Sequence, residues 1–186
     1  MNYKVLIAAS LAAIISLAAS ANDPLPQGWL KAGEGAAAAK CQTYADSGVV
    51  KTSKRSLTLH CDKAENGFIT VMQQFNAADY RGKRVRFSAQ VKASAVSDWG
   101  GLWMRVDGKA TAAFDNMNSR PIKGSSDWKR YDIVLDVAPD ATNIAFGMLM
   151  SGSGQMWMDD LKIEAVENSV AVTDSFTQKK PNLNLN

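Results

Sequence analysis

The chain has 186 residues, of which 46% are apolar and 21% are charged, and its formal net charge is +3. This composition is ordinary for a globular protein, so it excludes a disordered chain, a collagen-like repeat and a membrane protein with many spans. The small and dispersed excess of basic residues also argues against nucleic-acid binding, which usually requires a concentrated basic stripe.

The first 21 residues have the pattern of a cleaved secretory signal peptide. Lys4 precedes an apolar run from Val5 to Leu17, and a small-x-small site at Ala19 to Ala21 follows. The run is about 13 residues long, whereas a transmembrane helix needs roughly 20. No later segment is as apolar, so we expect no membrane span in the mature chain. The pattern predicts a periplasmic or secreted protein after cleavage near Ala21.

Two cysteines follow, Cys41 and Cys61, on segments that suit neighbouring strands. An exported protein meets an oxidising compartment, which favours a disulfide between them. A metal site is the less favoured alternative, because zinc requires four ligands and His60 is the only histidine of the chain.

Apolar and polar residues alternate through the body of the chain, which predicts β-strands. Clear examples run from Val85 to Val91, from Leu102 to Asp107 and from Trp128 to Val137. Further strands are expected at Ser56–Cys61, Ile69–Phe75, Ala112–Asn116, Ile144–Met150 and Gln155–Glu164. About eight strands predict an all-β fold, a two-sheet antiparallel β-sandwich over residues 22–166. Residues 167–186 lose the alternation and are predicted to form a flexible C-terminal tail.

Several motifs carry a resemblance to a known family. They are Gln27–Trp29, Tyr80–Val85, Trp99–Asp107, Phe114–Met117, Arg120–Ile122, Asp127–Tyr131, Phe146–Gly147 and Gln155–Leu161. Together they resemble a bacterial family of jelly-roll domains that is similar to galactose-binding-like carbohydrate-binding modules, some members of which are labelled transcriptional regulators. The resemblance covers roughly residues 27–166. It implies a galactose-binding-like jelly-roll that binds a ligand and does not catalyse a reaction.

The polar face of residues 101–107 is the main candidate for a binding site. Trp103, Arg105 and Asp107 share one side of the expected strand, because side chains two apart point the same way. An indole face suits the apolar side of a sugar ring, and a guanidinium and a carboxylate can hold its hydroxyls. The alternative is structural: Arg105 pairs with Asp107 or Asp115, and Trp103 caps the sandwich.

Loop residues are expected to extend this site. Trp99 lies in a glycine-rich loop, where it can form one wall of a cleft. Asp115, Asn116 and Arg120 enter a turn locked by Pro121 and can supply partners for hydroxyls. The alternatives are burial of Trp99 against the end of the sandwich and an Asx-type turn that Arg120 ties down.

A structural calcium ion is a further hypothesis, and no other cofactor is expected. Asp159 and Asp160 stand in the last expected strand and can supply two carboxylates. Backbone carbonyl oxygens of residues 22–33 can complete part of the six to eight oxygen ligands that calcium takes. The alternative is that one aspartate hydrogen-bonds a loop and the other is solvated.

These observations predict an exported, monomeric, non-catalytic binding module whose partner is a carbohydrate. The alternative from another class is an envelope structural or protein-interaction domain. A weaker alternative is a glycoside hydrolase that uses two carboxylates among Asp107, Asp115 and Asp132. The sequence contains neither a Gly-x-Ser-x-Gly elbow nor a cofactor-binding fingerprint, and either motif would favour an enzyme.

Overall fold

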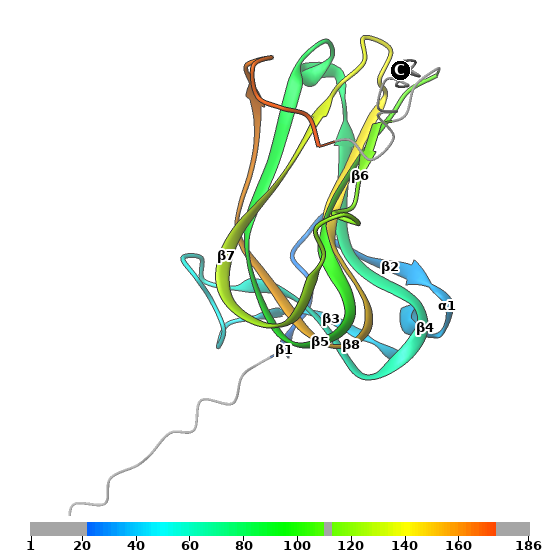
Figure 1. Cartoon of the computed structure of the whole chain (residues 1–186), viewed down its shortest axis with the longest axis vertical. Helices are drawn as coiled ribbons and strands as arrows, with labels where there is room; N and C mark the ends of the chain where they lie inside the picture. Colours follow the sequence, from blue (N-terminus) through cyan, green and yellow to red (C-terminus); the bar gives the residue numbers. More distant parts are fainter. Residues whose placement is uncertain (1–21, 110–112, 174–186) are drawn as a thin grey trace, which may run out of the picture.

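The computed structural model describes residues 22–109 and 113–173, and these residues form mainly β-strands (Figure 1). The elements are β1 (Asn22–Asp23), β2 (Leu30–Glu34), α1 (Gly35–Lys40), β3 (Gln42–Asp46), β4 (Ser56–Asn76), the 3₁₀ turn η1 (Ala78–Tyr80), β5 (Arg84–Asp107), β6 (Ala113–Asp115), β7 (Ile122–Asp136) and β8 (Asn143–Val166). Neither helical segment within these ranges has the length and apolar character needed to cross a membrane. The predicted signal segment, the expected strand start at Ala112 and residues 174–186 lie outside the described residues.

Three strands, β4, β5 and β8, are much longer than expected, with 21, 24 and 24 residues. The sequence predicts two short strands within each of them, but the structure joins each pair into one bent strand (Figure 1). Pairing of β5 with β8 extends from Arg84 opposite Val166 to Asp107 opposite Asn143, with register shifts on the way. Because this backbone pairing resumes beyond each irregularity, the bend does not end the strand.

The bends coincide with irregular backbone. The pairing of β4 with β8 shifts register between Cys61 and Ile69, and the pairing of β5 with β8 shifts between Ser94 and Trp99. Such bulges increase local twist and let a strand turn a corner. Gly154 lies at this corner of β8 with a φ of +121°, and a Cβ atom there would lie 2.6 Å from the carbonyl oxygen of Ala95. Only glycine permits this close approach of β8 to β5.

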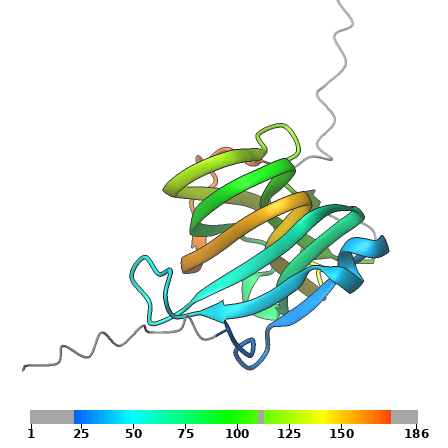
Figure 2. The same cartoon turned by 90° about the horizontal axis from the view of Figure 1, so that it is seen from below.

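Each long strand contributes to both layers of a sandwich. We name the layers after their edge strands. The β7 layer has the order β1-β3-β4-β8-β5-β7, and the β6 layer has the order β2-β4-β8-β5-β6. In the β6 layer the long strands contribute residues 69–76, 143–151 and 99–107. Figure 2 shows β7, β5, β8 and β4 side by side as they curve from one layer to the other.

The core lies between the two layers and is formed by alternate side chains of the strands. Its largest fully buried members include Leu59, Ile69, Phe87, Leu102, Met104, Ile133, Leu135, Ile144 and Met148. They belong to one contiguous apolar cluster, as expected for two antiparallel sheets packed face to face. The predicted all-β antiparallel β-sandwich is therefore confirmed.

Residues 167–173, which the sequence places in the C-terminal tail, lie against the edge of the sandwich. The backbone N–H of Thr173 donates to the carbonyl of Val134 at 2.8 Å, and its hydroxyl oxygen accepts from the N–H of Val134. The guanidinium of Arg84 donates to the carbonyl oxygens of Asn168 and Val170. This segment thus satisfies backbone groups of β7 that would otherwise remain on an open edge.

The predicted disulfide between Cys41 and Cys61 is present, and it links the residue after α1 to the first half of β4. The two Cα atoms lie 4.5 Å apart, and both cysteines are buried. The bridge closes a loop with a sequence separation of 20 residues, which includes β3 and the segment that leads into β4.

Replacing both cysteines by serine should lower the free energy of unfolding by about 3 kcal/mol, because the unfolded chain regains the entropy of an open loop. Urea denaturation of the oxidised protein and the double variant measures this difference. A thiol assay on the denatured, non-reduced protein is the control and should find no free thiol. One reactive thiol per cysteine would contradict the pairing.

Candidate ligand-binding site

The outer side of the β6 layer carries a second apolar cluster. Register places Trp99, Trp103 and Arg105 of β5 beside Ser151, Gly147 and Ala145 of β8. The buried members of this cluster are Trp103, Ala145 and Leu149, and the half-buried residues Met72, Trp99 and Phe114 pack on them. The outer side of the β6 layer therefore carries an apolar patch beside the polar residues Arg105 and Asp107, whereas the sequence predicts a polar face only.

Trp103 differs from the expectation that its indole faces solvent. Its side chain is only 7% exposed, and its Nε1–H donates to the hydroxyl of Thr70 at 2.8 Å. That hydroxyl donates in turn to the carbonyl of Met148 on the intervening strand. Trp103 is covered because side chains of β4, β6 and β8 close over it. It forms the floor of this surface, and the exposed part of the aromatic cluster comes from its neighbours.

Arg105 and Asp107 form the ion pair that the sequence analysis gives as the structural alternative. The guanidinium Nε of Arg105 lies 2.7 Å from the carboxylate of Asp107, which also accepts from the side-chain amide of Asn143 at 3.0 Å. Partial burial acts to raise the pKa of Asp107, but the hydrogen bonds from Arg105 and Asn143 and the charge of Arg105 outweigh it and lower that pKa. Arg105 remains about half exposed.

Trp99 lines an open pocket of about 520 Å³ at one end of this surface. The other lining residues are Gly67, Phe68, Asp98, Asn118, Pro121, Lys123 and Ser151. The carboxylate of Asp98 accepts from the hydroxyl of Ser151 at 3.0 Å. The indole Nε1 of Trp99 has no hydrogen-bond partner among the described residues, so packing alone holds this ring. We call this feature the Trp99 pocket.

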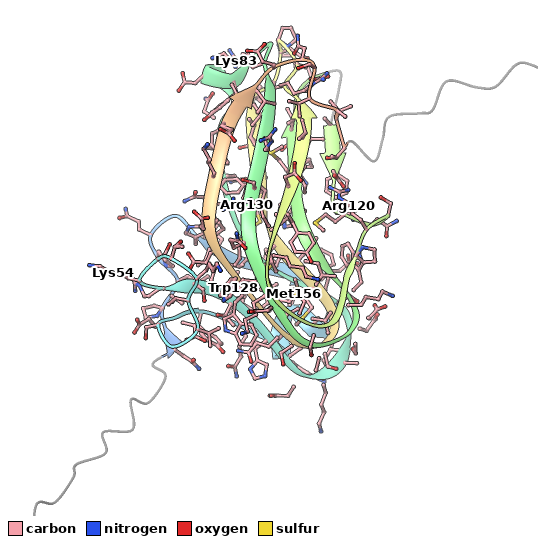
Figure 3. The ribbon with its side chains drawn as sticks, turned by 60° about the vertical axis from the view of Figure 1, so that its left-hand side comes forward. Lys54, Lys83, Arg120, Trp128, Arg130 and Met156 are labelled. Carbon is pink, nitrogen blue, oxygen red and sulfur yellow. A yellow bond between two sulfur atoms is a disulfide. The ribbon has the colours of Figure 1, made fainter. Side chains whose placement is uncertain are left out.

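Asp115, Asn116 and Arg120 are not among the described lining residues of the Trp99 pocket, but they hold the loop that contributes Asn118 and Pro121. Asp115 is fully buried, and its carboxylate accepts two hydrogen bonds from the guanidinium of Arg120 and one from the backbone N–H of Met117. The side chain of Asn116 accepts from the N–H of Asn118, which closes a local turn. Figure 3 shows Arg120 on the loop between β6 and β7. These contacts hold the loop that presents Asn118 and Pro121.

Trp99 is the one lining residue that the sequence predicts as part of the site. The other seven described lining residues are absent from that prediction: Gly67, Phe68, Asp98, Asn118, Pro121, Lys123 and Ser151. Phe68 comes from the bend of β4, and Lys123 comes from the start of β7. Phe68 and Lys123 are far from Trp99 in the sequence, so the sequence does not indicate that the three side chains border one pocket. The pattern Asp-Asn-Met-Asn at 115–118 does indicate a turn, but it does not indicate which side chain faces the ligand.

Trp103→Ala should lower the free energy of unfolding by about 3–5 kcal/mol, because it removes a buried aromatic side chain and leaves a cavity. Thr70→Val should cost about 1–3 kcal/mol, because the indole N–H then loses its acceptor in a buried place. Urea denaturation of both variants tests these values. A neutral effect of Trp103→Ala would mean that this indole faces solvent.

The two calcium candidates have protein partners in the β7 layer. Asp159 is 1% exposed, and one carboxylate oxygen accepts from the backbone N–H groups of Lys51, Thr52 and Ser53 at 2.6–3.2 Å. Its other oxygen accepts from the N–H of Asp160. Asp160 itself pairs with Arg130, which is labelled in Figure 3. Within residues 22–109 and 113–173, no three side chains of His, Cys, Asp or Glu gather as a metal-binding group.

The hydrogen bonds to Asp159 also set its acidity. Burial acts to raise its pKa, but the hydrogen bonds from Ser53, Lys51, Thr52 and Asp160 outweigh burial and hold the pKa below the ordinary 3.8. A carboxyl group whose pKa is lower in the folded state stabilises the fold above its unfolded pKa. That contribution disappears as the pH falls through the folded pKa.

Asp159→Asn should therefore cost roughly 2 kcal/mol of unfolding free energy at neutral pH, since hydrogen bonds to a charged acceptor are the stronger kind. The difference between the variant and the parent protein should shrink below the ordinary pKa of 3.8. Urea denaturation at a series of pH values measures it. A difference that stays constant down to the lowest pH would contradict the role of the charge.

Comparison with known sequences adds one informative relative. No family model matches the chain. A Bacillus subtilis (strain 168) protein described as an uncharacterized HTH-type transcriptional regulator, YbfP, is 48% identical over 109 residues. The match covers 58% of this chain but only 37% of that relative. It agrees with the predicted subgroup, some members of which bear such labels.

Comparison with solved structures identifies the class of fold. The enzymatically active domain of tailspike protein 4 from bacteriophage CBA120 matches with a TM-score of 0.59 and 12% identity, over 75% of this chain and 20% of that chain. The CBM22-1 xylan-binding domain of Paenibacillus barcinonensis Xyn10C matches with a TM-score of 0.52 and 15% identity, over 80% and 92%. The chain thus has the β-sandwich fold found in carbohydrate-binding modules, as the resemblance predicted.

Proposed function

We propose that this chain is an exported, non-catalytic carbohydrate-binding module and that a sugar binds in the Trp99 pocket. The observation that carries the proposal is a concave site, with an aromatic wall, on the outer side of the β6 layer. Its volume of about 520 Å³ falls within the roughly 300–1,000 Å³ that is typical of small-molecule sites. A protein-docking face would be broader and flatter.

The lining of the pocket has the chemistry that a sugar requires. The rings of Trp99 and Phe68 offer flat apolar surface to the C–H face of a pyranose ring. The side chains of Asp98, Asn118, Lys123 and Ser151 supply both donors and acceptors for its hydroxyls. The lining contains one acidic and one basic side chain, so its charges favour neither an anion nor a cation strongly.

The supports of the pocket are rigid, which favours binding because less order has to be created when the ligand arrives. Trp103 belongs to the apolar cluster on which Trp99 packs, and its indole N–H is held by Thr70. The ion pair of Asp115 with Arg120 holds the loop that forms another wall. In this proposal Trp103, Asp115 and Arg120 position the site, while Trp99 contacts the sugar.

The positions of the carboxylates support the non-catalytic part of the proposal. A glycoside hydrolase of the usual kind needs two carboxyl groups on opposite sides of the bond that it cleaves. Asp98 is the single carboxylate in the described lining of the Trp99 pocket. The three aspartates of the hydrolase hypothesis each lie beside an arginine: Asp107 beside Arg105, Asp115 beside Arg120 and Asp132 beside Arg86.

Export is supported by the signal-like pattern of residues 1–21 and by the disulfide, since disulfides persist mainly in oxidising compartments. We infer a periplasmic or secreted location and a monomeric state. An envelope interaction domain is the second candidate function. The sequence relative is a longer protein, and a shared fold does not imply a shared ligand.

An array of plant and bacterial polysaccharides that includes xylan tests the proposal, followed by titration calorimetry on any ligand that binds. Trp99→Ala should weaken binding at least about tenfold, because it removes the stacking surface. Trp128→Ala is the matched control, since Trp128 lies on β7 in the other layer (Figure 3), and it should leave binding unchanged.

Circular dichroism of both variants verifies that they remain folded, and an assay for reducing ends should detect no hydrolysis. Equal affinity of Trp99→Ala and the parent protein would place the sugar elsewhere. If no polysaccharide on the array binds detectably, the result would favour the protein-interaction alternative.

A further inference from the structure

A further pocket is separate from the Trp99 pocket. It has a volume of about 310 Å³ and is lined by Pro26, Trp29, Ala45, Ser53, Arg55, Ser56, Leu57 and Leu161. We call it the Arg55 pocket. Its residues come from the segment before β2, from β3, from the loop 47–55 and from β4 and β8. It shares no residue with the Trp99 pocket.

The lining combines an apolar interior with a single charged group. Pro26, Trp29, Leu57 and Leu161 supply apolar surface, and Leu57 belongs to the main core. Arg55 is the only charged side chain among the described lining residues. A site of this kind selects an anion that is attached to an apolar body, because guanidinium binds carboxylate in a bidentate manner.

Arg55 is available for such an anion. Its side chain is 46% exposed, and its ion pair with Asp23 has a distance of 3.7 Å. That distance is beyond the roughly 2.7–3.2 Å of an N–H···O hydrogen bond, so the pairing is loose. A carboxylate in the pocket can replace Asp23 at closer range and with two parallel hydrogen bonds.

The wall that carries Trp29 is locked by a tight turn. The N–H of Trp29 donates to the carbonyl of Pro26 at 3.1 Å. Gly28 occupies the third position of this turn with a φ of +86°, a conformation that favours glycine. The ring of Trp29 packs edge-on against Phe146 of the core, with ring centroids 5.6 Å apart.

The opposite wall is locked by the buried carboxylate of Asp159. Its oxygen accepts from the backbone N–H groups of Lys51, Thr52 and Ser53, and so it holds the loop that ends in Arg55. The hydroxyl of Ser56 donates to the carbonyl of Val49 at 2.7 Å, which closes the same loop. Two walls held in this way give a pocket that needs little ordering when a ligand enters.

We propose that the Arg55 pocket is a second binding site, distinct from the sugar site, and that it takes a small monocarboxylate carried on a single apolar ring. In this proposal the ring of the ligand lies between Trp29 and the two lining leucines, Leu57 and Leu161. The carboxylate of the ligand pairs with Arg55. The volume, at the lower end of ligand pockets, fits one ring rather than a polymer. This inference does not depend on the proposed sugar-binding function.

Benzoate is the probe, and benzamide is its uncharged counterpart of the same shape. Titration of the ¹⁵N-labelled protein should give saturable amide shifts at Trp29, Ser53 and Ser56 with benzoate. Arg55→Gln should weaken benzoate binding about tenfold or more, because a charge-assisted pair is lost. The same change should leave the weaker binding of benzamide unaltered.

Lys54→Gln is the matched control, because it removes the same charge from the same loop, one residue away from Arg55 and outside the lining of the pocket (Figure 3). Unchanged benzoate affinity in this variant together with the loss in Arg55→Gln establishes the site. An equal loss in both variants would indicate diffuse electrostatic attraction and overturn the proposal. No saturable shift, or shifts centred on Trp99, would also overturn it.

Discussion

Backbone pairing among β4, β5 and β8 is the constraint on which the rest of this molecule depends. The three strands stay hydrogen-bonded to one another on both sides of a bend, so both layers are parts of one sheet. A long ladder that folds over itself brings two apolar faces together and requires no separate docking of two sheets. It also requires positions where backbones nearly touch, and Gly154 beside Ala95 is one of them. The same bends place Phe68 and Trp99 at one end of the β6 layer, where they border a pocket.

Buried aspartates hold several of the loops that connect the strands of this sheet. Asp46 accepts from the indole of Trp157 and from the N–H groups of Gly48 and Val49. Asp115 and Asp159 hold the loops 116–121 and 47–55 in the same way. Since a carboxylate can accept several hydrogen bonds at once, one side chain can fix several backbone groups. In this fold, the buried carboxylates of Asp46, Asp115 and Asp159 each accept hydrogen bonds from backbone N–H groups.

The two pockets share a design although they lie in different parts of the fold. In each, an aromatic ring stands on a loop or bend, and a buried carboxylate secures the neighbouring loop. The sandwich is the rigid scaffold, and loop residues supply the polar and aromatic groups that face each pocket, as is common in binding proteins. The Trp99 pocket has charges of both signs and suits a neutral sugar. The Arg55 pocket has one cation and suits an anion.

The sequence by itself determined the all-β sandwich and the disulfide, because period-two alternation is a local pattern and two cysteines in an exported chain favour a bridge. Only the tertiary structure joined pairs of predicted strands into the long strands β4, β5 and β8. The sequence also singled out Trp99, which lines a pocket in the structure. Only the tertiary structure decided that Trp103 is buried, because alternation specifies the side of a strand and not what covers that side. Met72, Leu149 and Phe114 come from three other strands to cover it. The ion-pair partners of Arg105, Asp115 and Arg120 were likewise decided by the tertiary structure, because an ion pair forms only where the fold brings opposite charges together. The Arg55 pocket had no sequence signal, because its lining comes from four separate segments of the chain, around residues 26–29, 45, 53–57 and 161.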